Sequence, residues 1–356
     1  LHALTFSWVG APDWLSDKSI YANKVYSISN PADSEEASLD DLISYGKFLK
    51  KTYAKKPLVF CSSDVNLIFF HKYEKILSEY YCLPGDRTYK DFRSDIANKG
   101  LFYEKIRAHL PDLVLDNIYL FSSQCIEKLN NWNSFPCVIK PAEKDLSQSF
   151  YRSNNGLKAI KCEDRISLKK NVEKFLSLKH KLIIQEFIEF NNDTDEIPTY
   201  TYFDKNHSLR IYANGIKRII SPPKFGTAIA LELSYNKELI LISKKVGQAI
   251  SWHGPLMIEF VIDQKKNRLK ILEVNTRPWL FHDFYRQRGL PFIPMMIEEY
   301  KENLDYSKNL IVPNSEAIGS FNYDIIKMAE LFLKNNKNLS KSNYTSNKLT
   351  DDFISF

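Results

Sequence analysis

The sequence has few cysteines, and they are not arranged as a disulfide or zinc framework. The five are Cys61, Cys82, Cys125, Cys137 and Cys162. Their number is odd, their spacing is wide and no Cys-x-x-Cys pair occurs, which argues against both a set of disulfides and a zinc site. This use of cysteine is typical of a reducing compartment, so we expect a cytoplasmic protein.

Long apolar runs and blocks of basic residues are missing as well. No stretch approaches the roughly 18 apolar residues of a membrane-spanning helix. The 49 basic and 43 acidic side chains give a net charge of +6 and are mixed throughout, without the basic tail typical of nucleic-acid binding. The first residues, LHALTFSWVGAPDW, lack the pattern of a signal peptide. The chain begins with Leu1 rather than Met, so we expect that residues before it were removed or not included.

The residues that are present can build a large core. The 356 residues are 44% hydrophobic and 13% aromatic, which indicates a globular chain of two or three subdomains. Up to residue 95, strand and helix patterns alternate, which predicts an α/β layer with a parallel sheet. We expect strands in LHALTFSWVG, KVYSISNP and KPLVFCSSD, a helix in SLDDLISYGKFLKKTY that its first serine caps, and one long helix in VNLIFFHKYEKILSEYY. Asp64 is expected to cap that second helix.

Two segments near residue 260 carry the clearest chemical signal. PLMIEFVID and RLKILEVN are joined by a polar turn, which predicts an antiparallel hairpin. If Asp263 pairs with Leu269, Glu259 lies opposite Glu273 on one face. Carboxylates this close repel each other unless a cation lies between them, and a hard divalent ion such as Mg²⁺ fits. Asn275, one pleat further, can supply a neutral oxygen; the alternative is an exposed hairpin with its glutamates in water.

The order of motifs along nearly the whole chain resembles that of the ATP-grasp superfamily. The motifs are Lys99, VIKP at 138–141, IIQEFI at 183–188, IEF at 258–260 and LEVNTRPW at 272–279. The set is most similar to the carbamoyl-phosphate-synthetase-like and D-aspartate-ligase-like carboxylate–amine ligases. This resemblance implies an α/β and α+β architecture in which two α+β subdomains clamp ATP. The implied parts are a pre-ATP-grasp α/β domain at 1–95, with its first strand missing, ATP-grasp subdomains at 96–182 and 183–300, and a C-terminal helical tail at 301–356.

The resemblance also implies a nucleotide site. Lys140, which ends a predicted buried strand, is expected to contact the phosphates with help from Lys99. Lys99 lies near the middle of a predicted helix and could also be a solvated helix lysine. The adenine is expected to lie against the strand of Gln185, Glu186, Phe187 and Ile188, mostly through backbone groups. An acidic residue after this strand is expected to bind the ribose; the candidates are Asp193, Asp195 and Glu196. The loop of residues 147–155 has few glycines and is expected to be mobile until nucleotide binds.

The remaining roles implied by the resemblance concern metal and substrate. Glu259, Glu273 and Asn275 are expected to hold Mg²⁺, or Mn²⁺ in its place, and Arg277 to grip a carboxylate or the phosphoryl group. Lys217 and Arg218 lie near the phosphates or at a solvated hairpin tip. An acceptor pocket is expected along Trp279, Phe281 and His282. A single histidine beside aromatic residues is, however, more often structural.

The expected function is therefore an ATP-dependent carboxylate–amine ligase. Such an enzyme forms an acyl phosphate, releases ADP and phosphate, and acts on small molecules. The N-terminal layer of similar ligases often supports a homodimer. The alternatives are an ATP-grasp enzyme that uses bicarbonate or a hydroxyl acceptor, or a nucleotide-binding regulatory protein without activity. The sequence does not identify the two substrates.

Overall fold

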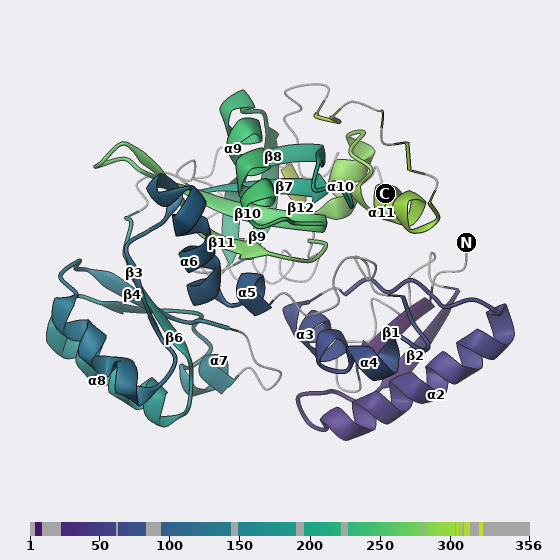
Figure 1. The fold of residues 1–356 in the computed structure, drawn as a ribbon, viewed down its shortest axis with the longest axis horizontal. Coiled ribbons are helices and arrows are strands. Elements are labelled where there is room, and N and C mark those ends of the chain that lie inside the picture. The colour runs from purple at the N-terminus through teal and green to yellow at the C-terminus, as the bar shows by residue number, and fades with distance from the viewer. Residues whose placement is uncertain are drawn as a thin grey trace, which may run out of the picture.

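The computed structural model describes most of the chain. The described residues are 4–8, 23–61, 63–82, 94–143, 149–189, 196–221, 227–279, 281–302, 304–305, 307, 310–313 and 320–322. They form three sheets, each the centre of one lobe in Figure 1. None of the helices in these ranges has the length and apolar character that crossing a membrane requires.

The N-terminal lobe is built on the parallel pair β1 (Leu4–Trp8) and β2 (Lys24–Ile28), as the sequence predicts. Helix α2 (Glu35–Tyr53) begins earlier than expected, because Ser34 rather than Ser38 caps it. Ser38 lies inside the helix and donates a hydrogen bond to the Ser29 carbonyl instead.

The second half of this lobe departs from the sequence prediction. The expected long helix breaks at Tyr73 into α3 (Asp64–Lys72) and α4 (Glu74–Leu77). The expected strand KPLVFCSSD is reduced to one parallel bridge between Leu58 and Cys82. Pro57 contributes to this limit, because proline has no N–H to extend a ladder.

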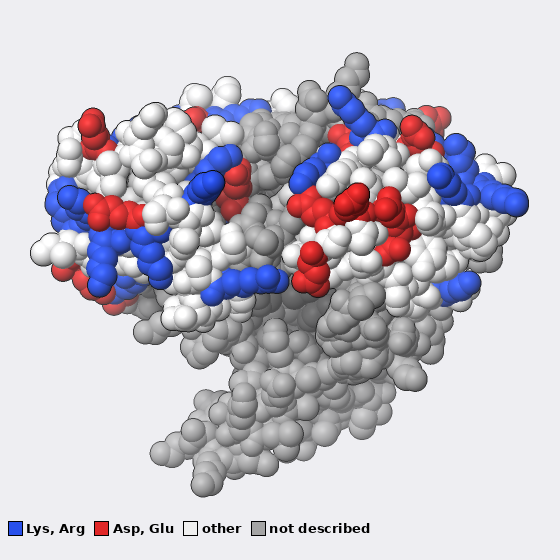
Figure 2. All heavy atoms as spheres, turned by 90° about the horizontal axis from the view of Figure 1, so that it is seen from below, with Lys and Arg blue, Asp and Glu red and all other residues white. Residues whose placement is uncertain are grey.

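The second lobe is a four-stranded antiparallel sheet in the order β3-β6-β4-β5. Its strands are β3 (Asn117–Leu120), β4 (Cys137–Pro141), β5 (Ile160–Cys162) and β6 (Leu182–Glu186). Helix α8 (Arg165–Ser177) packs Leu168, Val172 and Phe175 onto this sheet. Two further helical segments are η2 (Ser123–Asn131) and α7 (Ser149–Ser153). In Figure 2 basic side chains dominate the surface of this lobe, whereas acidic ones form a patch on the N-terminal lobe.

The third lobe is a six-stranded sheet in the order β11-β10-β7-β8-β9-β12. Its strands are β7 (Glu196–Phe203), β8 (Leu209–Ser221), β9 (Thr227–Ser234), β10 (Gly254–Asp263), β11 (Arg268–Asn275) and β12 (Ser320–Asn322). Helices α5 (Ser94–Ala97), α6 (Lys99–His109) and α9 (Lys237–Ala249) lie against one face, as Figure 1 shows. The 3-10 turn η1 (Pro111–Leu113) follows α6. Helices α10 (His282–Gln287) and α11 (Phe292–Tyr300) complete the lobe, together with a second aromatic cluster.

The hairpin of β10 and β11 forms as predicted, but its register near the turn is wrong in the prediction. Asp263 pairs with Arg268 rather than Leu269, and Val261 with Lys270. A β-bulge then shifts the ladder between Glu259 and Phe260. Because a bulge places one extra residue on one strand, it cancels the one-residue error. Glu259 therefore still lies opposite Glu273.

Candidate active site

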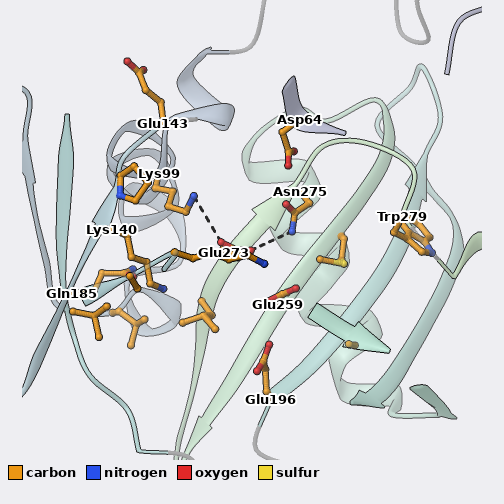
Figure 3. A pocket seen from close by; sticks show the side chains of 18 of the residues that line it. Asp64, Lys99, Lys140, Glu143, Gln185, Glu196, Glu259, Glu273, Asn275 and Trp279 are labelled. Carbon is orange, nitrogen blue, oxygen red and sulfur yellow. Dashed lines mark hydrogen bonds and ion pairs between the residues drawn. The ribbon is translucent and has the colours of Figure 1, made fainter. Parts of the chain in front are cut away.

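A single cavity of about 600 Å³ is lined by residues from all three lobes. This volume is in the usual range of small-molecule and cofactor sites. The α3 terminus lines it from the N-terminal lobe, β4 and β6 from the four-stranded sheet, and β10 and β11 from the six-stranded sheet. Figure 3 shows the lysines on one side and the carboxylates of the large sheet on the other.

The cavity brings together most of the residues that the sequence singles out. The predicted residues in its lining are Lys99, Lys140, Gln185, Glu186, Phe187, Ile188, Glu196, Lys217, Glu259, Glu273, Asn275, Arg277, Trp279 and Phe281. His282 is not in the lining, and its Nδ1 lies 2.9 Å from the carbonyl oxygen of Trp279, which is a structural contact. Asp193, Asp195 and the Arg218 side chain lie outside the described residues.

Several other residues that line the cavity were not predicted from the sequence. They include Asp64, Glu143, Tyr151, Lys158, Tyr200 and Met257. Residues 149–153 were expected in a loop but form α7, because Phe150 is buried against Phe175 with ring centroids 4.6 Å apart. An isolated apolar residue in a polar stretch was the only sequence signal for this anchor.

Lys99 is positioned by the start of α6, not by its middle as the sequence suggested. Asn98 caps the helix, and the Lys99 backbone N–H donates to the Ala142 carbonyl, 2.7 Å away. One turn later, the buried hydroxyl of Tyr103 donates to the carbonyl of Leu272, the extra residue of the bulge. Side chains four apart lie on one helix face, so Lys99 Nζ reaches to 3.8 Å from Glu273 Oε2.

Glu259 is the more buried of the two carboxylates in the row. It is 9% exposed, and burial raises its pKa to about 7, with Glu196 and Glu273 adding to the effect and Lys217 opposing it. Asn275 donates from Nδ2 to Glu273 Oε1 at 3.5 Å, as the dashed line in Figure 3 shows. The row therefore concentrates oxygen atoms and negative charge at one place.

Lys217 is buried, so it does not lie at a solvated hairpin tip. Its Nζ is 3.3 Å from Glu259 Oε2 and also forms an ion pair with Glu196. Burial by itself lowers the pKa of Lys217, but the carboxylates of Glu259 and Glu196 raise it above its ordinary value. Lys217 thus stays charged and offsets part of the negative charge of Glu259 and Glu196 on the six-stranded sheet.

Lys140 faces this charge from the four-stranded sheet, at the end of β4. Burial lowers its pKa, while Glu273, Glu259 and Glu196 act in the opposite direction. Within the described ranges it forms no ion pair. A half-buried ammonium without a near carboxylate suits an anionic ligand, since charge in a desolvated site needs compensation.

The β6 wall offers further groups to a ligand. Gln185 is 1% exposed, and neither polar atom of its side-chain amide has a hydrogen-bond partner in the described structure. An unpaired buried amide costs about 1–3 kcal/mol, so a bound ligand is a natural partner. The Glu186 carboxylate is already used: it accepts from the Asp116 N–H and from Arg268 Nη2, at 3.1 and 2.8 Å.

The opposite end of the cavity is apolar. The rings of Tyr200 and Trp279 pack in a tilted arrangement with centroids 4.5 Å apart, and Met257 and Phe281 extend the same wall. Apolar walls with a few convergent polar groups are typical of sites for small organic molecules. The charged row thus lies between the β6 wall, which carries the buried amide of Gln185, and an apolar end.

The oxygen ligands of the row fit Mg²⁺. No cluster of three or more His, Cys, Asp or Glu residues that could hold a metal occurs among the described residues. Mg²⁺, however, is usually held by one or two carboxylates together with substrate phosphates, rather than by a cage made only of protein groups. Glu259, Glu273 and the amide oxygen of Asn275 line the cavity and can supply that partial shell.

Comparison with known proteins places this architecture. No family model matches the sequence. A D-alanine–D-alanine ligase of Carboxydothermus hydrogenoformans is 30% identical over 142 residues, which span 35% of this chain and less than half of that ligase, 44%.

Two solved structures match over most of the chain. An L-amino acid ligase from Bacillus licheniformis has a TM-score of 0.61 at 17% identity and covers 87% of this chain and 70% of its own. The biotin carboxylase domain of a Hydrogenobacter thermophilus 2-oxoglutarate carboxylase, in complex with MgADP and bicarbonate, has a TM-score of 0.62 at 14% identity and covers 86% and 66%. The chain therefore has the ATP-grasp fold and resembles the carboxylate–amine ligases that share it.

Proposed function

We propose that the protein is an ATP-dependent ligase that joins a carboxylate to an amine. The observation that carries this proposal is the cavity itself, in which Lys99 and Lys140 face the row of Glu259, Glu273 and Asn275. Cations on one wall and metal-binding oxygens on the other suit a polyphosphate held with Mg²⁺. The names of the ligases with similar sequence and fold support the same reading.

In this proposal the nucleobase lies against β6 and the phosphates extend toward the lysines. The amide of Gln185 gains a hydrogen-bond partner in the base, and Lys140 and Lys99 neutralise phosphate oxygens. Glu259, Glu273 and Asn275 hold Mg²⁺, which when bound offsets charge on the phosphates. Lys217 stays paired with Glu259 and Glu196 and keeps the buried carboxylates of this row in place.

The substrate carboxylate binds between this row and the apolar end of the cavity. It attacks the γ-phosphorus of ATP, the bond from that phosphorus to the β,γ-bridging oxygen breaks, and ADP leaves. The acyl phosphate then accepts an amine at its carbonyl carbon, and inorganic phosphate departs with the electron pair of the acyl–oxygen bond. Arg277 lines the cavity at the end of β11, where its charge can stabilise the anionic oxygens.

The protein does little covalent work in this scheme. Its residues position two reactants and neutralise developing charge, which is how phosphoryl transfer is generally catalysed. The apolar wall of Tyr200, Met257 and Trp279 excludes water that could hydrolyse the acyl phosphate. The same wall favours substrates with an apolar portion.

A screen of ADP release tests the proposal. The protein is incubated with MgATP and pairs drawn from D- and L-amino acids, with bicarbonate and simple alcohols as separate acceptor arms. Release of ADP and phosphate that needs both an amino acid and an amine, with an amide product in the mass spectrum, is the expected result. ADP release with bicarbonate alone indicates a carboxylating enzyme, and phosphorylated alcohol indicates a kinase. MgATP binding without ADP release in any arm contradicts a ligase.

A further inference from the structure

Asp64 comes from the N-terminal lobe, yet it lines the cavity with Ser63 and Val65. The sequence suggests that Asp64 caps α3, but the structure gives that role to Ser63, whose Oγ accepts from the Asn66 N–H at 3.2 Å. The Asp64 carboxylate therefore serves another task than the helix cap. Figure 3 shows it pointing down into the site, above Asn275.

That task is contact with Arg277, which lies 213 residues further along the chain. Arg277 Nε is 2.9 Å from Asp64 Oδ1, and Nη2 donates to Oδ2 at 3.0 Å. The carboxylate thus lies on the side of the guanidinium that carries Nε, with a hydrogen bond from Nη2 and an ionic contact to Nε. Both side chains are 19% exposed, and a partly exposed pair of this kind contributes little to stability.

The pairing leaves part of the guanidinium for a second anion. Arginine has five N–H donors in a planar fork. Asp64 takes the edge of Nε and Nη2, and Nη1 donates to the Pro278 carbonyl at 3.3 Å. One N–H on Nη2 and one on Nη1 remain without a partner among the described residues. A planar guanidinium can grip a second carboxylate or phosphoryl group along that edge.

We propose that Asp64 is a positioning residue, which holds the Arg277 guanidinium so that its Nη1–Nη2 edge meets a pair of anionic oxygens in the cavity. This inference rests on the proposed function and extends it. The anionic oxygens belong to the terminal phosphoryl group of ATP or to the substrate carboxylate. The N-terminal lobe is then a working part of the active site and not only a scaffold beside it.

Calorimetric titration with two nucleotides tests this role. The advantage of the Mg complex of the non-hydrolysable triphosphate AMPPNP over MgADP is measured in the wild type and in Asp64→Asn. We expect the ratio of the two affinities to fall about fivefold in the variant, because the long side chain of Arg277 is no longer ordered before binding. Its affinity for MgADP should stay within twofold. Asp64→Glu, which keeps a carboxylate, should recover part of the loss.

Further variants separate positioning from simple loss of charge or fold. Asp40→Asn removes one exposed charge from α2 in the same lobe and should leave both affinities unchanged. Arg277→Lys keeps the charge but not the fork, and should show the loss of Asp64→Asn. The double variant should show no further loss, because both changes disable one contact. Equal weakening of both nucleotides contradicts positioning and indicates a structural role.

A second arm distinguishes the two sources of anionic oxygen. L-alanine and D-alanine are titrated into the MgADP complexes of the same proteins. A loss confined to the alanine arm assigns the arginine edge to the substrate carboxylate, and a loss confined to the triphosphate arm assigns it to the phosphoryl group. No loss in either arm overturns the role of Asp64 while the proposed function stands. Failure of the wild type to bind MgADP overturns the proposed function and this inference with it.

Discussion

Two glutamates, Glu259 and Glu299, are each 9% exposed, yet their pKa values move in opposite directions. Burial raises the pKa of Glu259 in the cavity row to about 7, with Lys217 opposing the effect and Glu196 and Glu273 adding to it. Burial acts on Glu299 of α11 in the same direction, but hydrogen bonds from His253 and Tyr202 outweigh it and lower the pKa to about 2. Burial alone therefore does not decide the state of a carboxylate.

The partners of Glu299 account for the difference. Tyr202 donates to Oε2, His253 Nε2 lies 2.9 Å from the same oxygen, and the Lys205 backbone N–H donates to Oε1 at 2.9 Å. This carboxylate is fully used in joining α11 to the sheet. Glu259 has one ammonium and two neighbouring carboxylates. A buried carboxylate with all its hydrogen bonds made is typical of a structural role, whereas one with a raised pKa in a cavity is a candidate for a functional site.

The largest expected effect is on turnover. Glu273→Gln should reduce ligase turnover on the order of 1000-fold, because it removes one of the two carboxylates proposed to hold the metal. The melting temperature without metal should be unchanged or slightly raised, since like-charge repulsion is relieved. Steady-state ADP release and thermal unfolding check the two parts. Full activity in the variant, or equal stabilisation of both proteins by MgATP, argues against a metal site here.

The converse is expected at the other glutamate. Glu299→Gln should lower the free energy of unfolding by about 3 kcal/mol, because it removes the buried, hydrogen-bonded carboxylate whose pKa is lowered to about 2. The loss should be independent of Mg²⁺ and nucleotide, unlike any effect at Glu273. Chemical denaturation measures it, with Glu298→Gln on the exposed side of α11 as the control. A variant as stable as the wild type contradicts a structural role for Glu299, and with it the contrast to the cavity glutamates.

A smaller effect is expected on nucleotide affinity, at Lys140 of the four-stranded sheet. Lys140→Ala should weaken MgATP binding by about 30-fold, the size expected for losing a hydrogen bond to a charged group. The fold should remain intact, which circular dichroism verifies. Lys169→Ala, an exposed lysine on α8, serves as the matched control and should bind normally. Unchanged affinity in a folded Lys140→Ala protein removes this lysine from the phosphate site.

The smallest effect is a difference in pH dependence. Because the pKa of Glu299 is lowered, its stabilising contribution is present above the ordinary value of 4.5 and is lost as pH falls toward 2. Because the pKa of Glu259 is raised, the folded protein binds the extra proton below about 7, and that stabilisation is lost as pH rises through 7. Stability profiles of Glu259→Gln and Glu299→Gln against the wild type should therefore diverge from it in opposite pH ranges. Parallel profiles contradict the opposite shifts.

Local patterns in the sequence were sufficient for several elements. The alternation of apolar and polar residues located the hairpin of β10 and β11, and the apolar run before Lys140 located β4. The break of the expected helix at Tyr73 was not predicted, because the composition around it is uniformly helix-compatible. Strand β3 was also missed, since its four residues are too short for a clear period.

Contacts between lobes could not be read from the sequence. Asp64 and Arg277 each have a plausible local reading, and only the folded chain shows that they meet. Within the six-stranded sheet the same holds for Lys217 on β8, whose partners Glu196 and Glu259 lie on β7 and β10. Pairwise contacts of this kind depend on the packing of distant segments, on which short-range periodicity carries no information.

The sequence alone was enough to nominate residues for the proposed chemistry: a row of Glu, Asn and Arg on one strand, a glutamate on its neighbour, and a lysine ending a buried strand. The period of two along a strand makes this possible, because it assigns side chains to faces without any knowledge of the rest of the chain. Only the tertiary structure decided how they meet. The bulge at Leu272, held by Tyr103, set Glu259 against Glu273, and the approach of the N-terminal lobe set Asp64 against Arg277. Both depend on how distant elements pack, and there a shift of one residue reverses a face.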